Sequence, residues 1–310
     1  DNFIVYNNQS YSAFDLNNNI NIKKRSLKVS NLNNGSKVII FLPNGIEYVE
    51  IIITCLELGI NTFDHADIYG GYTTETDFGK AFINLGINRS DVFFISKCGI
   101  QYPSKKRKLE IKYYDYSKEY IIKSAETSIK NLNADYLDLL LLHRPSPLMN
   151  EDEISSAIDY LKKQGKIKAF GVSNFQFSQI ELLKTNCEIK WNQIEFSLTN
   201  NELAFNGLFD YLMKSKIKAM AWSPLGSYFK LKDVKSKRIE RVLKLLKKKY
   251  DASEDQLLLS WIMNHPLNIL PVIGTTKKER IKAAIESLNI NLDKSDWFSL
   301  LVASQGYKVP

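Results

Sequence analysis

The run YLDLLLLH occupies residues 136–143 and is apolar at nearly every position between Leu137 and Leu142. A strand with one solvated side alternates apolar and polar residues, whereas a strand buried on both faces is apolar throughout. We therefore expect residues 136–143 to form a central strand of a parallel sheet. Seven further runs have the same continuous character: KVIIFL (37–42), NTFDH (61–65), DVFFISK (91–97), IKAFGVS (167–173), IKWNQIEF (189–196), IKAMAWS (217–223) and LNILPVI (267–273).

The stretches between these runs have apolar residues spaced about 3.6 apart, which is typical of amphipathic helices. The clearest of them are residues 47–59, 74–85, 117–132, 151–165 and 178–186. Ser117 and Ser178 stand where N-caps are expected, and Gly59 and Gly165 stand where helices are expected to end. Eight strand–helix units in about 250 residues predict an α/β fold of the (β/α)8 TIM barrel type.

Two further helical segments, residues 253–265 and 294–304, exceed the count of a simple barrel. We interpret them as extra helices that decorate the barrel. The alternative fold is a doubly wound open sheet, which usually carries a glycine-rich dinucleotide loop after its first strand. The stretch LPNGIE (42–47) after the first predicted strand contains no G-x-G-x-x-G. The barrel is therefore the favoured fold.

The composition is that of an ordinary globular protein of 310 residues, 44% of them hydrophobic. With 14 Gly, 8 Pro and 3 Cys, it excludes a collagen-like, disordered or disulfide-stapled chain. The three cysteines, Cys55, Cys98 and Cys187, are scattered, which indicates a reducing, cytoplasmic setting and no zinc site. No run approaches the roughly 18 apolar residues of a membrane span. No secretory leader is visible, and the start at Asp1 leaves open that sequence precedes it.

The net charge is +8, from 42 Lys+Arg and 34 Asp+Glu. This excess permits a nucleic acid, a membrane surface or a phosphorylated small molecule as a partner. The stretches VLKLLKKKY (242–250) and PSKKRKLEIK (103–112) are basic and could bind nucleic acid beside an aromatic groove. We favour a solvated helix face and a surface loop, and so expect neither a nucleic-acid nor a membrane partner. The sequence does not indicate the oligomeric state, and a monomer is the default.

Four chemically active side chains lie at or just after the predicted ends of three successive strands. Asp64 ends the second strand with Tyr69 in the loop behind it, Lys97 ends the third, and His143 ends the fourth. Catalytic groups of a TIM barrel come from the carboxyl ends of its strands. Each residue alone has a structural explanation, such as a cap, an ion pair or a core histidine. Together they predict a catalytic site.

The chemistry of these four groups suggests reduction of a carbonyl. A tyrosine with a pKa near 10 is a weak acid at pH 7, and a neighbouring ammonium would stabilise its phenolate and lower that pKa. Tyr69 would then donate a proton, with Asp64 holding Lys97 in place. His143 would orient the carbonyl oxygen. Because none of these groups supplies a hydride, a cofactor must bind nearby.

Four motifs carry a resemblance to a known family: DHADIYGG (64–71), ISKCG (95–99), DLLLLHRP (138–145) and FGVSNF (170–175). With them, residues 60–310 resemble the aldo-keto reductases, and in particular a bacterial oxidoreductase branch. The resemblance implies a barrel that binds NADP(H) across its mouth and reduces aldehydes or ketones without a metal. It also implies that Asp64, Tyr69, Lys97 and His143 are the catalytic tetrad.

The same resemblance assigns residues to the nicotinamide half of the cofactor. Those matching the positions that bind the carboxamide or stack on the ring are Ser173, Asn174, Gln193 and Trp222. Those matching the loop that binds the pyrophosphate are Ser223, Leu225 and Gly226. Trp222 would aim one face of the nicotinamide ring at the substrate.

The segment after the last predicted strand matches the one that holds the adenosine 2′-phosphate. Its residues are Gly274, Thr275, Thr276, Lys277 and Arg280. An arginine and paired hydroxyls beside a helix start suit a phosphate, because the donors and the helix dipole add. Ala284 stands where many family members have asparagine, so the adenine contacts depart from the family pattern here.

Residues 1–59 fit this family poorly. The stretches FIVYNNQSYSAFDLNNNIN (3–21) and GSKVIIFLPNGIEYVEIIITCLELG (35–59) resemble the start of an adenylate-forming (AMP-binding) enzyme domain. Since the second stretch is itself strand, loop and helix, we expect it to replace the first βα unit of the barrel. We divide the chain into an N-terminal extension, residues 1–35, and a barrel, residues 36–310. The alternative is that residues 1–35 form an appended hairpin and helix.

Three functions remain open at this point. The leading one is NADPH-dependent reduction of an aldehyde or ketone. The second is an NADP(H)-binding regulatory module without catalysis, and the third is an inactive chimera whose altered first unit leaves the pocket malformed. The substrate is not indicated, because the loops that would select it, residues 98–116 and 198–210, show no periodicity.

Overall fold

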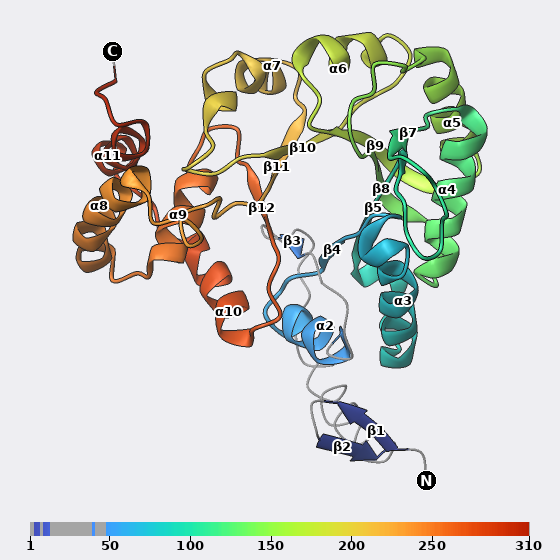
Figure 1. Cartoon of the computed structure of the whole chain (residues 1–310), viewed down its shortest axis with the longest axis horizontal. Coiled ribbons are helices and arrows are strands. Elements are labelled where there is room, and N and C mark those ends of the chain that lie inside the picture. Colours follow the sequence, from blue (N-terminus) through green and yellow to red (C-terminus); the bar gives the residue numbers. More distant parts are fainter. Residues whose placement is uncertain (1–2, 7–8, 13–38, 41–47, 310) are drawn as a thin grey trace.

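The computed structural model describes residues 3–6, 9–12, 39–40 and 48–309 (Figure 1). Within this part of the chain, eight parallel strands close into a barrel in the order β10-β11-β12-β3-β4-β5-β8-β9. Their bounds are β3 (Ile39–Ile40), β4 (Thr62–Asp64), β5 (Phe93–Cys98), β8 (Leu137–Leu142), β9 (Ile167–Ser173), β10 (Trp191–Glu195), β11 (Lys218–Trp222) and β12 (Leu270–Ile273). Each of the eight predicted runs overlaps one of these strands, with β5 extending one residue beyond its run to Cys98, and the (β/α)8 barrel is confirmed.

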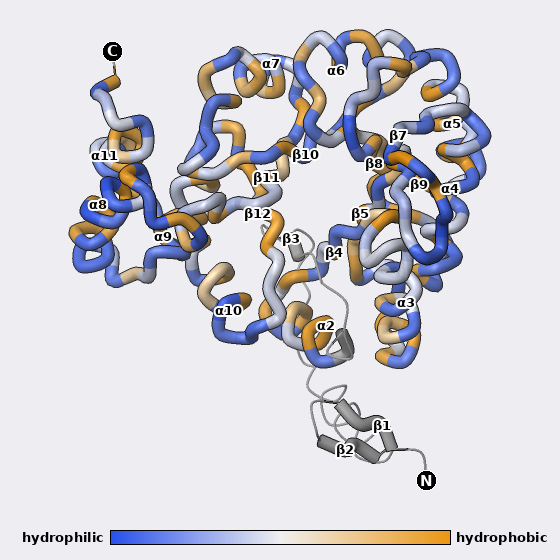
Figure 2. The backbone as a smooth tube through the Cα atoms, in the orientation of Figure 1, coloured by the Kyte–Doolittle hydropathy of each residue, from blue (hydrophilic) through white to orange (hydrophobic). Residues whose placement is uncertain are grey.

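The apolar runs form strands because both of their faces are buried. Leu139, Leu140, Leu141 and Leu142 of β8 are all fully buried. Leu139 and Leu141 belong to the cluster that fills the inside of the barrel, together with Met220, whereas their neighbours in sequence pack outward against the helices. The period of two along a strand therefore divides one apolar run between two cores. Figure 2 shows hydrophobic residues along β12 and a mixture of hydrophobic and hydrophilic residues along the helices outside the ring.

The helices surround the ring of strands (Figure 1). Their bounds are α2 (Tyr48–Glu57), α3 (Thr74–Leu85), α4 (Lys118–Asn131), α5 (Glu151–Lys163), α6 (Phe177–Lys184), α7 (Leu208–Lys214), α8 (Val234–Tyr250), α9 (Glu254–Met263), α10 (Lys278–Glu286) and α11 (Lys294–Gln305). Both expected extra helices are present, as α9 and α11. None of the helices that the structure describes is both long and apolar enough to cross a membrane.

The predicted helix ends are mostly right. Ser117 caps α4 by accepting a hydrogen bond from the backbone N–H of Tyr120, and Gly59 and Gly165 follow α2 and α5 with positive φ angles. Ser178 is wrong as an N-cap, because α6 begins one residue earlier, at Phe177. The cap is Gln176, whose backbone N–H donates to Oε1 of Gln179 at 2.9 Å. This glutamine pair satisfies the helix start, so the exposed Ser178 hydroxyl is not needed there.

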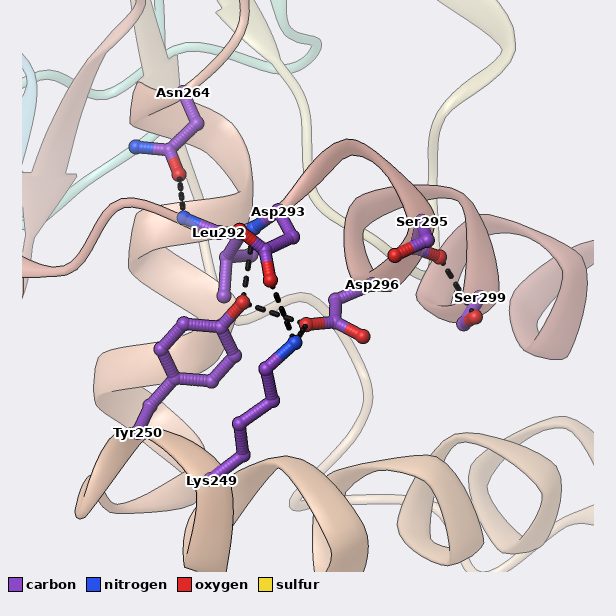
Figure 3. Close-up of polar contacts among 8 residues, drawn as sticks. All are labelled: Lys249, Tyr250, Asn264, Leu292, Asp293, Ser295, Asp296 and Ser299. Carbon is purple, nitrogen blue, oxygen red and sulfur yellow. Dashed lines mark hydrogen bonds and ion pairs between the residues drawn. The ribbon is translucent and has the colours of Figure 1, made fainter.

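Helices α8 and α11 pack against each other beside the barrel. Lys249 of α8 bridges Asp293 and Asp296 at 2.6 Å each, at the start of α11. The Tyr250 hydroxyl donates to Asp296 at 2.6 Å and accepts from the backbone N–H of Asp293 at 2.9 Å (Figure 3). We call Lys249, Tyr250, Asp293 and Asp296 the outer cluster.

The N-terminal residues that the structure describes lie in two sheets. β1 (Phe3–Tyr6) and β2 (Gln9–Ser12) pair antiparallel as a hairpin of their own. β3 joins the barrel, with Ile39 opposite Val272 of β12 and Ile40 opposite Phe63 of β4. The strand in this stretch thus occupies the position of a first barrel strand, and α2 follows it. The proposed boundary at residues 35–36, a helix within 13–35 and the loop PNGIE (43–47) fall outside the described residues.

Candidate active site

Lys97 lies at the centre of the site, near the carboxyl end of β5. Its Nζ donates hydrogen bonds to Oδ2 of Asp64 at 2.7 Å, to the backbone oxygen of His65 at 2.9 Å and to the hydroxyl of Tyr69 at 3.0 Å. These three acceptors satisfy the three protons of the ammonium group. The side chains of Lys97 and Asp64 are only 1% and 3% exposed. The pair is therefore a desolvated ion pair at the functional end of the barrel.

Tyr69 and His143 face each other above this pair. Tyr69 belongs to the short 3-10 helix η1 (Tyr69–Gly71) that follows β4, and its ring meets that of His143 edge-to-face with centroids 5.7 Å apart. The backbone N–H of His143 donates to the oxygen of Cys98 at 2.9 Å, which holds it directly after β8. Nδ1 of His143 is buried without a hydrogen-bond partner among the described residues. The structure thus brings Asp64, Tyr69, Lys97 and His143 into one place.

Burial and charge set the protonation of these groups. Burial alone would lower the pKa of Lys97, but Asp64 and Tyr69 outweigh it and hold that pKa above its ordinary value. Burial, with the charge of Lys97 next, holds the pKa of His143 well below its ordinary value, so the imidazole is neutral at pH 7. We expected Lys97 to bring the pKa of Tyr69 below its ordinary value, and this is wrong. Lys97 lowers the pKa of Tyr69, but burial raises that pKa by more, so the pKa lies above its ordinary value.

The residues assigned to the nicotinamide form one network at the ends of β9, β10 and β11. Nδ2 of Asn174 donates to Oγ of Ser173 at 2.9 Å, and its Oδ1 accepts from Nε1 of Trp222 at 3.0 Å. Asn174 has a positive φ of 60°. Nε2 of Gln193 donates to Oδ1 of Asp64 at 3.0 Å, which links this network to the ion pair with Lys97. The amide groups are therefore held rigidly beside the four side chains described above.

The loop after β11 contains Ser223, Leu225 and Gly226, and it turns sharply. The backbone N–H of Gly226 donates to the oxygen of Ser223 at 2.8 Å, and both residues have positive φ. A Cβ atom at Gly226 would lie 2.0 Å from Oγ1 of Thr199 and 2.4 Å from Oγ of Ser197. Only glycine fits here, so the loop is drawn tightly against the segment that follows β10.

The segment after β12 leads into α10. Gly274, Thr275 and Thr276 precede Lys277, which is the N-cap residue and whose backbone N–H donates to Oγ1 of Thr275 at 3.2 Å. Lys277 and Arg280 are both exposed. Two cations and threonine hydroxyls thus gather at a helix start, which is a favourable setting for an anion. Ala284 of the same helix, by contrast, is buried in the hydrophobic core.

A second buried acid close to Lys97, Asp67, was not identified from the sequence. Asp67 accepts hydrogen bonds at Oδ2 from Ser124 at 2.9 Å and from the Tyr120 hydroxyl at 3.2 Å, both contributed by α4. Burial, with the nearby charge of Glu75, raises the pKa of Asp67 to about 7. Asp67 lies within the motif DHADIYGG, two residues before Tyr69. Its place in this motif could have drawn attention to Asp67, but the sequence does not reveal that Ser124 and Tyr120 of α4 contact it.

The described residues contain no group of three or more His, Cys, Asp and Glu side chains suited to a metal ion. The side chains that do converge are an acid–base set of lysine, aspartate, tyrosine and a neutral imidazole. Such a set can hold and donate a proton and can hydrogen-bond an oxygen atom. Hydride transfer requires a bound cofactor.

Comparison with known proteins gives consistent matches. The profile of the aldo/keto reductase family matches residues 45–300. The uncharacterized oxidoreductase YcsN of Bacillus subtilis (strain 168) is 39% identical over 270 residues, which cover 85% of this chain and 90% of that protein. The 6-dehydroglucose reductase of Agrobacterium fabrum is 36% identical over 262 residues, covering 83% and 88%. A Bombyx mori aldo-keto reductase crystallised in complex with NADP has the same fold, with a TM-score of 0.70 at 23% identity, covering 87% of this chain and 90% of that one.

The family match begins at residue 45, inside the stretch that resembles an adenylate-forming enzyme. Residues 45–59, which include α2, therefore belong to the matched region rather than to the poorly fitting N-terminus. The resemblance of residues 1–59 to adenylate-forming enzymes stays a prediction.

Proposed function

The chain belongs to the aldo/keto reductase family, and from that premise we propose that it reduces an aldehyde or ketone to an alcohol with NADPH. The observation that carries the proposal is the contact of Lys97 with both Asp64 and Tyr69 at the strand ends, with His143 facing Tyr69. The reductase activity in the name of the Agrobacterium fabrum relative supports the reaction class.

The residues fit a dinucleotide in three respects. The amides of Asn174 and Gln193 are fixed beside the ion pair and can hydrogen-bond a carboxamide. The close approach of Gly226 to Thr199 and Ser197 fixes the shape of the loop that follows β11, against which a pyrophosphate can lie. Lys277 and Arg280 stand exposed at the start of α10, where a 2′-phosphate can be bound. The NADP complex of the Bombyx mori protein, which shares the fold, adds support.

When bound, the reduced nicotinamide supplies a hydride to the carbonyl carbon. The carbonyl oxygen takes the proton of the Tyr69 hydroxyl, so the substrate gains one hydride and one proton and becomes an alcohol. The raised pKa of Tyr69 keeps it protonated at pH 7, and the hydrogen bond from Lys97 to its oxygen leaves that proton on the tyrosine. Lys97 then stabilises the phenolate that remains.

His143 and Asp64 act on the same step in different ways. The neutral imidazole can donate an N–H to the carbonyl oxygen and so fix its direction toward Tyr69. Asp64 holds Lys97 charged and in contact with Tyr69, and through Gln193 it couples the ion pair to the carboxamide network. We place the reaction in the cytoplasm, because Cys55, Cys98 and Cys187 are all unpaired and buried, as a reducing compartment allows.

Tyr69→Phe tests the role of the proton donor. We expect kcat for 4-nitrobenzaldehyde to fall by about 10²- to 10⁴-fold, with NADPH binding retained, because only the proton donor is lost. Tyr160→Phe is the matched control, since this tyrosine is exposed on α5 away from the site. Undiminished turnover in Tyr69→Phe would rule out the proposed acid. NADPH binding by the unmodified protein without turnover of any carbonyl would favour a regulatory module.

Arg280→Gln tests the cofactor. Titration followed by tryptophan fluorescence should show Kd for NADPH rising by about 10-fold, because a charge-assisted contact to phosphate is lost. Kd for NADH should stay within about twofold, since NADH has no 2′-phosphate. Lys282→Gln removes the same charge from the same helix and is the control. Equal loss for both cofactors would place Arg280 elsewhere than at the 2′-phosphate.

A further inference from the structure

Arg144 directly follows His143 and has no part in the function proposed above. Its guanidinium lies over the ring of Trp222, 5.2 Å from the ring centroid. Its charge lowers the pKa of both Tyr69 and His143. Among the ion pairs of the described residues, none involves Arg144. A half-buried cation with no carboxylate partner among the described residues therefore lies beside the reacting groups.

The backbone of Arg144 is held by a dedicated contact. The buried hydroxyl of Tyr116 donates to the carbonyl oxygen of Arg144 and accepts from its backbone N–H. The ring of Tyr116 lies so close to Gly99, whose φ is 105°, that a Cβ there would be 1.8 Å from Cε1 of the ring. Gly99 therefore admits the tyrosine, and the tyrosine fixes Arg144. The backbone from which the guanidinium extends toward Trp222 is therefore fixed in place.

The charge around this position is positive. All three charged side chains that shift the pKa of His143, namely Lys97, Arg144 and Lys112, are cations. Lys112 belongs to the loop between β6 (Ile100–Gln101) and β7 (Tyr113–Tyr114), which carries five basic residues and one acid. Of the nearby acids, Asp64 is paired with Lys97, and Asp67 is bonded to α4. Among the described residues, the charges that act on His143 therefore favour the binding of an anion.

We propose that Arg144 binds a carboxylate on the substrate, so that the site takes carbonyl compounds that are also carboxylic acids. The planar guanidinium can donate two parallel hydrogen bonds to the two oxygens of a carboxylate. A neutral sugar or an alkyl group does not offer such a charged pair of acceptors. The exposed Lys112, whose charge also acts on His143, adds to the positive charge. This inference rests on the proposed reductase function and names the class of its substrate.

The test compares two aldehydes of nearly the same size and shape, 4-carboxybenzaldehyde and 4-nitrobenzaldehyde, of which only the first is an anion. The readout is the ratio of their kcat/KM values, which cancels any general effect on turnover. In Arg144→Gln we expect this ratio to fall by about 10-fold or more, through KM of the carboxylate, because a hydrogen-bonded charge pair is lost. Arg144→Lys should recover part of the ratio, since lysine keeps the positive charge but cannot form the two parallel hydrogen bonds of the guanidinium.

Lys163→Gln is the control, because this exposed lysine at the end of α5 lies at the opposite end of the barrel. It should leave the ratio unchanged. An unchanged ratio in Arg144→Gln overturns the inference while the reductase function stands. A rise in Kd for NADPH with an unchanged ratio also overturns it and assigns the cation to the cofactor. Absence of turnover of both aldehydes by the unmodified protein instead counts against the reductase function itself.

Discussion

Two clusters of this molecule join the same three kinds of side chain, and they differ mainly in burial. In the active site Lys97 contacts Asp64 and Tyr69, and in the outer cluster Lys249 contacts two aspartates with Tyr250 alongside (Figure 3). The lysine–carboxylate distances are 2.7 Å and 2.6 Å. The side chain of Lys97 is 1% exposed and that of Lys249 is 48% exposed. Short contacts alone therefore do not distinguish a reaction centre from a surface ion pair.

Burial changes what each contact does. Water competes for the exposed ion pair and screens it, so the outer cluster adds little to the stability of α8 against α11. In the barrel, water is excluded, and each charged group depends on its partner for solvation. The pKa of Tyr69 shows this dependence, since burial raises it while Lys97 opposes the rise. The active site thus couples protonation to a few fixed contacts, as proton transfer requires.

Lys97→Met should give the largest effect, because it leaves the Asp64 carboxylate buried without its cation. We expect the free energy of unfolding to fall by about 3–5 kcal/mol and carbonyl turnover to be lost. Urea unfolding and kcat measure the two. The double variant Asp64→Asn/Lys97→Met should regain stability but not activity, because it removes the unpaired charge. A single variant as stable as the unmodified protein would show that burial does not decide the comparison.

Asp67 sharpens the comparison with Asp296 of the outer cluster. The pKa of Asp67 is raised to about 7 by burial and by Glu75, whereas hydrogen bonds from Lys249 and Tyr250 lower the pKa of Asp296. Between about pH 4 and 7 the folded protein keeps the Asp67 proton while the unfolded chain releases it. The free energy of unfolding should therefore decrease as the pH rises through this interval.

Asp67→Asn should remove that decrease. We expect the change in unfolding free energy between pH 4.5 and pH 8 to shrink by on the order of 2 kcal/mol, as measured by urea unfolding at several pH values. Asp296→Asn is the control. Because the pKa of Asp296 is lowered, its ionised carboxylate stabilises the fold above about pH 4, and this stabilisation is lost only at lower pH. Asp296→Asn should therefore leave the change between pH 4.5 and pH 8 unaltered. An unaltered pH dependence in Asp67→Asn would mean that this acid is ionised in the fold.

The barrel and the four central residues of the site could be predicted because they follow from local patterns. Continuous apolar runs identify the strands, and parallel strands bring their carboxyl ends to one face. Asp64, Lys97 and His143 could therefore be placed near one another without knowing any packing. Even the two residues of β3 fall inside the run KVIIFL (37–42) that was expected to supply a strand.

The features that could not be predicted depend on how elements dock. Asp67 meets Ser124 and Tyr120, which are 57 and 53 residues away, only because α4 turns that face toward it. Tyr116 can hydrogen-bond the backbone of Arg144 only because its ring packs against Gly99, and the sequence does not reveal this packing. The strands β6 and β7 have two residues each and are too short for a period. The direction in which the pKa of Tyr69 shifts likewise depends on its burial, which cannot be predicted from the motif.

Lys249→Met makes the same substitution as Lys97→Met in the outer cluster, and we expect the smallest effect there. The Tyr250 hydroxyl still bonds Asp296 and the backbone N–H of Asp293, and water can solvate both carboxylates. The melting temperature should fall by no more than about 2 °C in dilute buffer and by less in 1 M NaCl, because salt screens exposed pairs. Thermal unfolding at the two salt concentrations measures this. A loss as large as that of Lys97→Met would break the comparison, since two lysines of such different burial would then contribute alike.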